Sequence, residues 1–291
     1  MSTTRKAGGG CTLVELPAVG ECERRAFTLV ELLVVIGIIG LLIAILLPTL
    51  NKAQESSRQV KCLSNIKQIS NAIVQYTNEN RGVMPARGGG NVVFHVAGNP
   101  ASGAWDWIAW HRRVDPITNR TVSGAADLQI TDSAIARYLG NSSTVLDQIF
   151  RCPSDSLLAR PNGPTDLSRP FYRYSYSANQ FVMSGGVGSP KKVTSIRNPA
   201  QKVLIVCEDE KTLDDALYNP QPSQWASGRI NAVAARHRIK PVGARSSRVN
   251  EQNQDVLGNV GFVDGHAEIF SRKDALRQRH TDNPSADPSD F

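Results

Sequence analysis

The chain has 291 residues, of which 33 are lysine or arginine and 26 are aspartate or glutamate, so its formal net charge is +7. A basic balance can indicate a nucleic-acid or anionic-lipid partner, but these basic residues are scattered and form no dense run interleaved with aromatic residues. We therefore expect a solvated basic surface and no nucleic-acid partner. The sequence also lacks a Rossmann glycine fingerprint, a P-loop and a zinc-finger spacing.

The first element in the chain is an apolar run at residues 27–47. Of its 21 residues 17 are apolar, and a helix that rises about 1.5 Å per residue would cross the roughly 30 Å of a bilayer core. A cleaved secretory signal would have a shorter apolar core followed by small residues, whereas this run ends in Leu47-Pro48. We expect a transmembrane helix over 27–50, preceded by a leader peptide at 1–26.

Glu31 is the one carboxylate in this apolar run. An ionised side chain in hydrocarbon is strongly unfavourable, but the penalty falls when a neighbouring cation pairs with it. If the chain is cut before Phe27, the new amino group of one copy can pair with Glu31 of the next copy in a bundle of helices. The alternative is a Glu31 carboxylate that reaches water at the membrane interface.

The apolar pattern continues into an amphipathic helix at residues 51–80. Apolar residues recur at spacings of three and four, which places them on one helix face, and Asn80 followed by Pro85 ends the pattern. We therefore predict one helix from 27 to about 80, in which Pro48 removes one backbone hydrogen bond. The predicted buried face consists of Val60, Leu63, Ile66, Ile69 or Ser70, Ile73 and Tyr76.

Residues 81–280 predict a β-rich extracytoplasmic domain with long loops rich in glycine and proline, and 281–291 a polar tail. Asp264-Gly265 lies between two alternating runs, which is a strong signal for a β-hairpin. A long helix followed by antiparallel strands gives an α+β class, with the helix packed on an antiparallel sheet. The other expected elements are strands at Val92–Val96, Trp105–His111, Phe171–Ser177 and Val203–Cys207 and a short helix at Ser133–Leu139.

The five cysteines divide into two groups. Cys11 and Cys22 lie in the leader, which leaves Cys62, Cys152 and Cys207 in the rest of the chain. An odd number of cysteines in an exported chain allows two interpretations. One is a Cys62–Cys152 disulfide formed in an oxidising compartment, and the other is three cysteines buried as small hydrophobic side chains.

His237, Asp264 and His266 are weak candidates for a metal or catalytic site, with the acidic residues 208–210 as further ligands. Asp264 is also explained as the turn residue of the hairpin, and His266 as the residue that flanks it. We therefore expect no catalytic residues, no metal site and no cofactor. Calcium is the metal considered for the acidic tail, which lacks a recognisable ligand spacing.

The segment Arg24-Arg25-Ala26, followed by Phe27–Ile36, resembles the start of type IV prepilins, and of type II secretion pseudopilins in particular. The resemblance implies that a prepilin peptidase cuts between Ala26 and Phe27 and methylates the amino group of Phe27. It also implies that Glu31 is required for assembly. The family usually has glycine before the cut, whereas this chain has Ala26.

Further patches resemble a pseudopilin-like group with a C-terminal His-x9-Asp-Gly motif. In that group the histidine lies ten residues before the aspartate, whereas the nearest histidine upstream of Asp264 is His237. An insertion at roughly 238–254 would reconcile the two patterns. The patches are Cys62–Ile69, Phe150–Asp155, Tyr174–Asn179 and Asn259–His266.

The resemblance implies a structural subunit of a type II secretion pseudopilus or type IV pilus-like filament, not an enzyme. It would be a single-pass inner-membrane protein with a periplasmic domain, and later part of the filament. Its partners would be prepilin peptidase, other pilin or pseudopilin subunits, the inner-membrane assembly platform and the membrane.

The alternative function is a membrane-anchored extracytoplasmic ligand-binding protein that uses the prepilin leader for export. Trp105, Trp107, Trp110 and His111 would then line the ligand surface, or they would instead pack on the long helix. An anchored hydrolase is a third interpretation, but the sequence has no Gly-x-Ser-x-Gly nucleophile motif.

Overall fold

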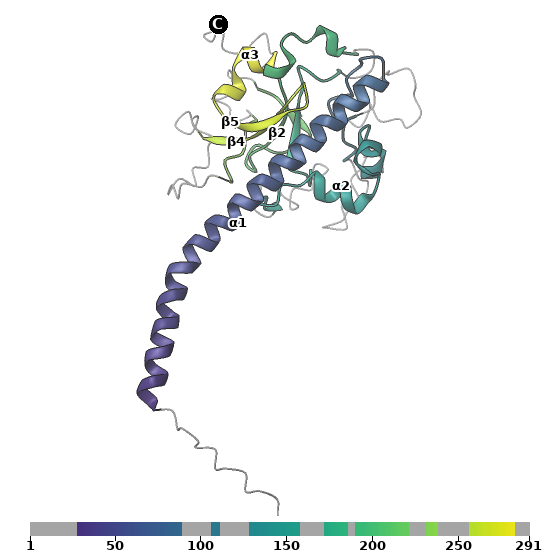
Figure 1. Cartoon of the computed structure of the whole chain (residues 1–291). Coiled ribbons are helices and arrows are strands. Elements are labelled where there is room, and N and C mark those ends of the chain that lie inside the picture. The colour runs from purple at the N-terminus through teal and green to yellow at the C-terminus, as the bar shows by residue number, and fades with distance from the viewer. Residues whose placement is uncertain are drawn as a thin grey trace, which may run out of the picture. The chain divides into compact units, whose positions relative to one another are not determined.

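The computed structural model of the whole chain describes residues 28–88, 106–110, 128–157, 172–185, 190–220, 231–237 and 256–282 (Figure 1). The chain divides into two compact units, Met1–Leu50 and Asn51–Phe291. Each unit is described by itself.

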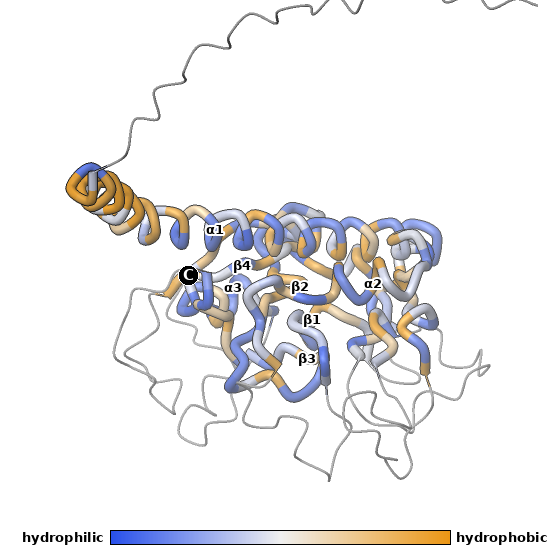
Figure 2. The backbone as a smooth tube through the Cα atoms, turned by 90° about the horizontal axis from the view of Figure 1, so that it is seen from below, coloured by the Kyte–Doolittle hydropathy of each residue, from blue (hydrophilic) through white to orange (hydrophobic). Residues whose placement is uncertain are grey.

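The first helix, α1, is Leu29–Glu79, and it contains Pro48 without ending there. The prediction of a long helix from 27 to about 80 is therefore confirmed. In the first unit its large apolar side chains are all exposed, and they give the orange stretch of Figure 2. Among the residues described, α1 is the one helix that is long and apolar enough to cross a membrane, by length and composition.

In the second unit α1 buries one face in the domain. The predicted face is confirmed from Ile66 onward, but Val60 is 66% exposed and Leu63 only partly buried. Burial begins at Cys62, because the helix meets the core of the domain only from that turn. The buried residues of α1 are Cys62, Asn65, Ile66, Ile69, Ser70, Ala72, Ile73, Tyr76 and Thr77.

The domain contains a five-stranded sheet with the order β3-β1-β2-β4-β5. The pairs β1–β2, β2–β4 and β4–β5 are antiparallel, and the pair β1–β3 is parallel. The strands are β1 (Tyr176–Asn179), β2 (Val203–Cys207), β3 (Leu217–Tyr218), β4 (Leu257–Phe262) and β5 (Ala267–Ser271).

The sheet is therefore mixed, whereas the sequence predicted an antiparallel one. The difference arises at β3. After β2 the chain crosses to the far side of β1, where β3 pairs with the free edge of β1. The strand β3 runs antiparallel to β2. Because β1 is also antiparallel to β2, β3 and β1 are parallel to each other. The α+β class itself is confirmed.

The strand Val203–Cys207 and the Asp264-Gly265 hairpin are confirmed, and Gly265 has the positive φ of 95° that such a turn requires. The strand predicted at Phe171–Ser177 overlaps β1 only at its end, and the segment 106–110 has no strand. Val92–Val96 lies outside the described residues. The helix predicted at Ser133–Leu139 is a 3₁₀ turn at Ala136–Leu139, preceded by another at Ile130–Asp132.

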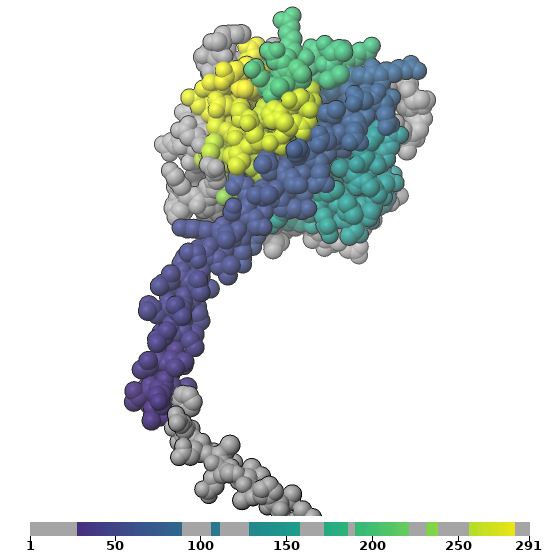
Figure 3. Space-filling model, in the orientation of Figure 1, coloured from purple at the N-terminus to yellow at the C-terminus, as the bar shows by residue number. Residues whose placement is uncertain are grey.

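The remaining elements are short and were not predicted. They are the helices α2 (Ser143–Ile149) and α3 (Gln278–Thr281) and the 3₁₀ turns Val193–Ser195, Pro199–Gln201 and Asp274–Leu276. In the space-filling view the second half of α1 lies between α2 and the hairpin β4–β5 (Figure 3).

The second half of α1 lies across one face of the sheet (Figures 1 and 2). The contact is closest at Gly261 of β4, where an added Cβ would lie 2.2 Å from Ser70 Oγ and 2.7 Å from Ile66 Cγ2. Asn259 Nδ2 also donates to the carbonyl of Gln59 on α1, at 3.2 Å. Helix and sheet together enclose the main apolar core, which extends to Trp107 and the tyrosines before β1.

Candidate functional site

The start of α1 is closed by a reciprocal pair of hydrogen bonds between Thr28 and Glu31. The Thr28 backbone N–H and Oγ1 each donate to Glu31 Oε2 at 2.8 Å, and the Glu31 N–H donates to Thr28 Oγ1 at 3.2 Å. This arrangement is a capping box, and its Thr-x-x-Glu signature can be read from the sequence. Ala26 and Phe27, the predicted processing residues, lie outside the described residues.

A second group of polar side chains lies in the core of the second unit. Cys62 comes from α1, Cys152 follows α2, Cys207 ends β2, and His237 lies in the segment 231–237. Their Sγ and ring nitrogen atoms all lie within 4.8 Å of one another. The four side chains are buried, with residue exposures of 0%, 3%, 0% and 7%. We call these four residues the Cys₃His cluster.

The three cysteines of the Cys₃His cluster are free thiols. Among the described residues the structure therefore shows no Cys62–Cys152 disulfide, and it places the two sulfur atoms beside Cys207. The sequence grouped His237 with Asp264 and His266, but only His237 joins the cysteines.

The ring of His237 is held from both sides. Nδ1 lies 2.8 Å from Glu55 Oε1, and Nε2 lies 3.1 Å from Cys152 Sγ. An ionised carboxylate only accepts hydrogen bonds, so Nδ1 carries a proton and Nε2 is the atom that faces the sulfurs. Ser154 Oγ donates to the same Glu55 oxygen at 2.6 Å and fixes the carboxylate.

The surroundings of the Cys₃His cluster shift the pKa values of its members in different directions. Hydrogen bonds from Cys207 and Cys62 lower the pKa of Cys152 against the effect of burial, and burial raises the pKa of Cys207 well above its usual value. Burial lowers the pKa of His237, but its interactions with Cys152 and Cys62 outweigh this and raise the pKa to about 10. The two shifts have opposite directions and favour negative charge on Cys152 beside positive charge on His237.

Two further donors point at the other sulfur atoms. The Tyr176 hydroxyl donates to Cys62 Sγ at 3.5 Å, and Arg236 Nη1 lies 3.6 Å from Cys207 Sγ. Arg236 is buried and also pairs with Glu210 at 3.0 Å and Asp155 at 3.5 Å. Each sulfur of the cluster therefore has a polar donor beside it.

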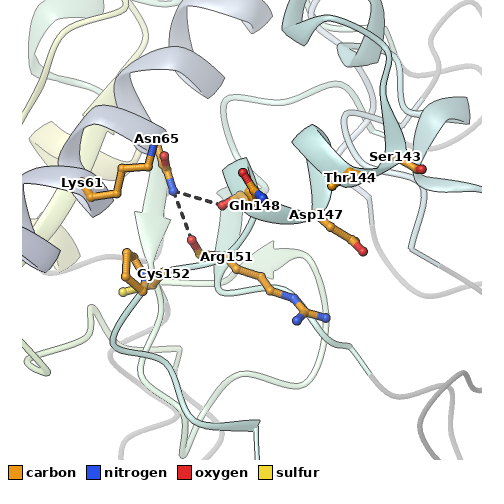
Figure 4. A pocket seen from close by; sticks show the side chains of 9 residues that line it. Lys61, Asn65, Ser143, Thr144, Asp147, Gln148, Arg151 and Cys152 are labelled. Carbon is orange, nitrogen blue, oxygen red and sulfur yellow. Dashed lines mark hydrogen bonds between the residues drawn. The ribbon is translucent and has the colours of Figure 1, made fainter. Parts of the chain in front are cut away.

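An open hollow of about 590 Å³ lies next to this cluster, between α1 and α2 (Figure 4). Asn65 crosses its floor and donates from Nδ2 to the carbonyls of Gln148 and Arg151, at 3.3 and 3.1 Å. Cys152 is part of its wall. The lining residues are Lys61, Asn65, Ser143, Thr144, Asp147, Gln148, Arg151, Cys152 and Pro153.

Asp264 and His266 lie together at the hairpin turn. Both are partly exposed, and Asp264 Oδ1 lies 2.5 Å from His266 Nδ1. The His266 ring stacks on Phe262 with 4.3 Å between ring centroids. Both residues therefore have a local role in the turn.

The acidic side chains of residues 208–210 contact residues outside the Cys₃His cluster. Burial raises the pKa of Glu208 well above its usual value, and its Oε1 accepts from Thr212 and Asn231. Asp209 pairs with Arg272 at 2.8 Å, and Glu210 with Arg236.

The two tryptophans that the structure describes are core residues. Trp107 and Trp110 are buried, with their rings edge-on to Phe150 and Tyr172 at centroid distances of 5.8 and 5.0 Å. Their Nε1 atoms donate to the carbonyls of Arg87 and Gly88. Trp105 and His111 lie outside the described residues.

Comparison with known proteins concerns the N-terminal part of the chain. Residues 23–47 match a family model described as the prokaryotic N-terminal methylation motif, and this stretch includes Glu31 and the apolar first part of α1. No curated protein and no solved structure matches the chain. The motif supports a prepilin-like protein that a peptidase processes, and the long apolar helix followed by an α+β domain is a pilin-like fold.

Proposed function

We propose that the chain is a structural subunit of a pseudopilus or type IV pilus-like filament, processed between Ala26 and Phe27 and assembled through α1. The observation that carries this proposal is the methylation motif at residues 23–47. Most of the motif lies on α1, whose first part exposes apolar side chains on all sides and has Glu31 as its one charged residue. Such a surface needs either lipid or copies of itself as a partner.

In this proposal Glu31 forms an ion pair with the neighbouring subunit. Cleavage leaves a cationic amino group on Phe27, and in a bundle of α1 helices Glu31 of one subunit neutralises that group on the next. A paired charge in an apolar bundle is far less unfavourable than a lone one. Subunits without the pairing would remain in the lipid, where Glu31 reaches the interface.

The finer assignments belong to the same proposal. The partners are prepilin peptidase, other pilin or pseudopilin subunits and the inner-membrane assembly platform, and the domain from residue 51 lies in the periplasm. The filament we propose is a type II secretion pseudopilus, because the sequence resembles the pseudopilins of that system. Within them it resembles the group that carries the C-terminal His-x9-Asp-Gly motif.

The test combines mass spectrometry of the N-terminal peptide with electron microscopy of sheared fibres. We expect the mature chain to begin at a methylated Phe27 and to be present in fibres. The variant Glu31→Ala should be cut normally but remain in the membrane fraction. Normal incorporation of Glu31→Ala into sheared fibres would overturn the assembly role.

The alternative, a membrane-anchored ligand-binding protein, has one observation in its favour, the open hollow at Asn65. Its predicted aromatic surface loses Trp107 and Trp110, which are buried. A processed protein that never enters fibres, even when the remaining filament subunits assemble, would favour this alternative.

A further inference from the structure

We propose that the Cys₃His cluster binds one divalent thiophilic cation, and that this cation is zinc. Its ligands are Cys62, Cys152, Cys207 and His237. The proposal concerns the core of the second unit and does not depend on the assembly role of α1.

The first argument is the donor set and its spacing. Three cysteine sulfurs and one imidazole nitrogen are one of the usual ligand sets of structural zinc, and a tetrahedral ion at its normal bond lengths holds such atoms roughly 3.4–3.8 Å apart. The four atoms already lie within 4.8 Å of one another, with Cys152 Sγ and His237 Nε2 at 3.1 Å. Small shifts of these side chains would bring the four atoms to the spacing of one tetrahedral ion.

The second argument is the set of groups behind the ligands. Histidine ligands of zinc usually donate their other N–H to a carboxylate, which orients the ring, and His237 has this partner in Glu55 at 2.8 Å. Tyr176 and Arg236 place donors at the sulfurs of Cys62 and Cys207. Donors there stabilise two of the three thiolates that a metal held by these cysteines requires.

A metal explains this arrangement better than a disulfide. Any single disulfide joins two of the three sulfurs, leaves the third as a buried thiol and gives no role to His237 Nε2. A metal ion uses all four atoms at once.

A metal also explains it better than a catalytic cysteine. The order Cys152, His237, Glu55 resembles a nucleophile, its base and an orienting group, but Cys152 is only 3% exposed and has two other thiols around it. A substrate carbon would have to enter the space that these thiols fill. Cys152 forms part of the wall of the hollow, and a bare cation needs far less room than a substrate to reach the four ligands from there.

The sequence did not show this site because each ligand comes from a different element. None of the four residues forms a short Cys-x-x-Cys pair, and tens of residues separate each from the next. The fold alone brings α1, the segment after α2, the end of β2 and the segment 231–237 together.

The experiment uses the full chain in detergent with the leader cysteines replaced (Cys11→Ser, Cys22→Ser). The protein is purified with zinc and a mild reductant, and its metal content is measured by mass spectrometry. We expect about one zinc per chain. Exchange with Co²⁺ should give the thiolate charge-transfer absorption and the visible bands of a tetrahedral site.

The variants separate ligands from bystanders. Cys207→Ser and His237→Gln should lose the stoichiometric metal, and Glu55→Gln should weaken Co²⁺ binding roughly 10–100-fold, because Glu55 only positions the imidazole. The matched control is His266→Gln, which removes a partly exposed histidine outside the cluster and should retain one zinc.

Three results would overturn the proposal, and the first and third are obtained on the chain with its ligands intact. One is the absence of both bound zinc and a Co²⁺ spectrum after reductive purification with either metal. Another is retention of full metal content by the cysteine and histidine variants. The third is selective alkylation of Cys152 in metal-free, folded protein together with no metal uptake, which would assign Cys152 as a nucleophile.

Discussion

At the scale of single residues, Glu31 has two physical roles that can be separated. Its carboxylate accepts two hydrogen bonds from Thr28 and so closes the start of α1, and in the proposed filament it neutralises an amino group. Loss of a helix N-terminal cap typically destabilises a helix by about 0.5–2 kcal/mol. Loss of the countercharge instead leaves a cation unpaired in an apolar bundle.

Two substitutions distinguish these roles. Glu31→Gln keeps a residue that can form the capping box but removes the charge, whereas Thr28→Val removes the hydroxyl of the cap and keeps the charge. We expect Glu31→Gln to be processed and absent from sheared fibres, and Thr28→Val to be processed and incorporated. The measurement is an immunoblot of sheared and membrane fractions. The reverse pattern would show that Glu31 acts as a cap and that charge pairing is not required.

At the scale of elements, the contact between α1 and β4 depends on a missing side chain. A Cβ at Gly261 would lie 2.2 Å from Ser70 Oγ and 2.7 Å from Ile66 Cγ2, so helix and sheet would have to separate. We expect Gly261→Ala to lower the free energy of unfolding by about 1–3 kcal/mol, the usual penalty for overpacking a core. Denaturant unfolding followed by circular dichroism measures it.

The matched control for this prediction is Gly40→Ala. A Cβ at Gly40 meets nothing within 4 Å, and the residue lies in the first unit, so the domain should unfold at the same denaturant concentration as the unsubstituted protein. An unchanged midpoint for Gly261→Ala would mean that the helix and the sheet adjust to the extra methyl group without loss of stability.

The elements of the domain differ in how well the sequence predicts them. The long helix and the hairpin have strong local signals, in the apolar spacing of α1 and in Asp264-Gly265. The helix α2 has only seven residues and β3 only two, too few for a periodicity. The parallel pairing of β3, like the meeting of Cys62 with Cys207, depends on which strands become neighbours, and that is decided by long-range packing.

At the scale of the whole domain, the Cys₃His cluster brings together four parts of the chain that are far apart in the sequence. One ligand is on α1, one ends the central strand β2, and the other two lie in segments without regular structure. A bound ion stabilises the folded state by mass action, provided that it binds the unfolded chain more weakly. A metal bound to the cluster would therefore fix the positions of the helix, the sheet and the two segments relative to one another.

Removal of the metal should therefore lower the thermal stability of the domain. At a free zinc concentration about 100 times the Kd, binding contributes about 2.7 kcal/mol, which corresponds to about 5–10 °C in Tm at roughly 2–4 °C per kcal/mol for a domain of this size. We expect a chelator to lower Tm by this amount and added zinc to restore it, as measured by circular dichroism in reductant. Cys207→Ser lacks one ligand, so its Tm should equal that of the chelator-treated unsubstituted chain, both with chelator and with added zinc. His266→Gln should respond to chelator as the unsubstituted chain does, and equal Tm values with and without zinc for the unsubstituted chain would show that the cluster contributes no metal-dependent stability.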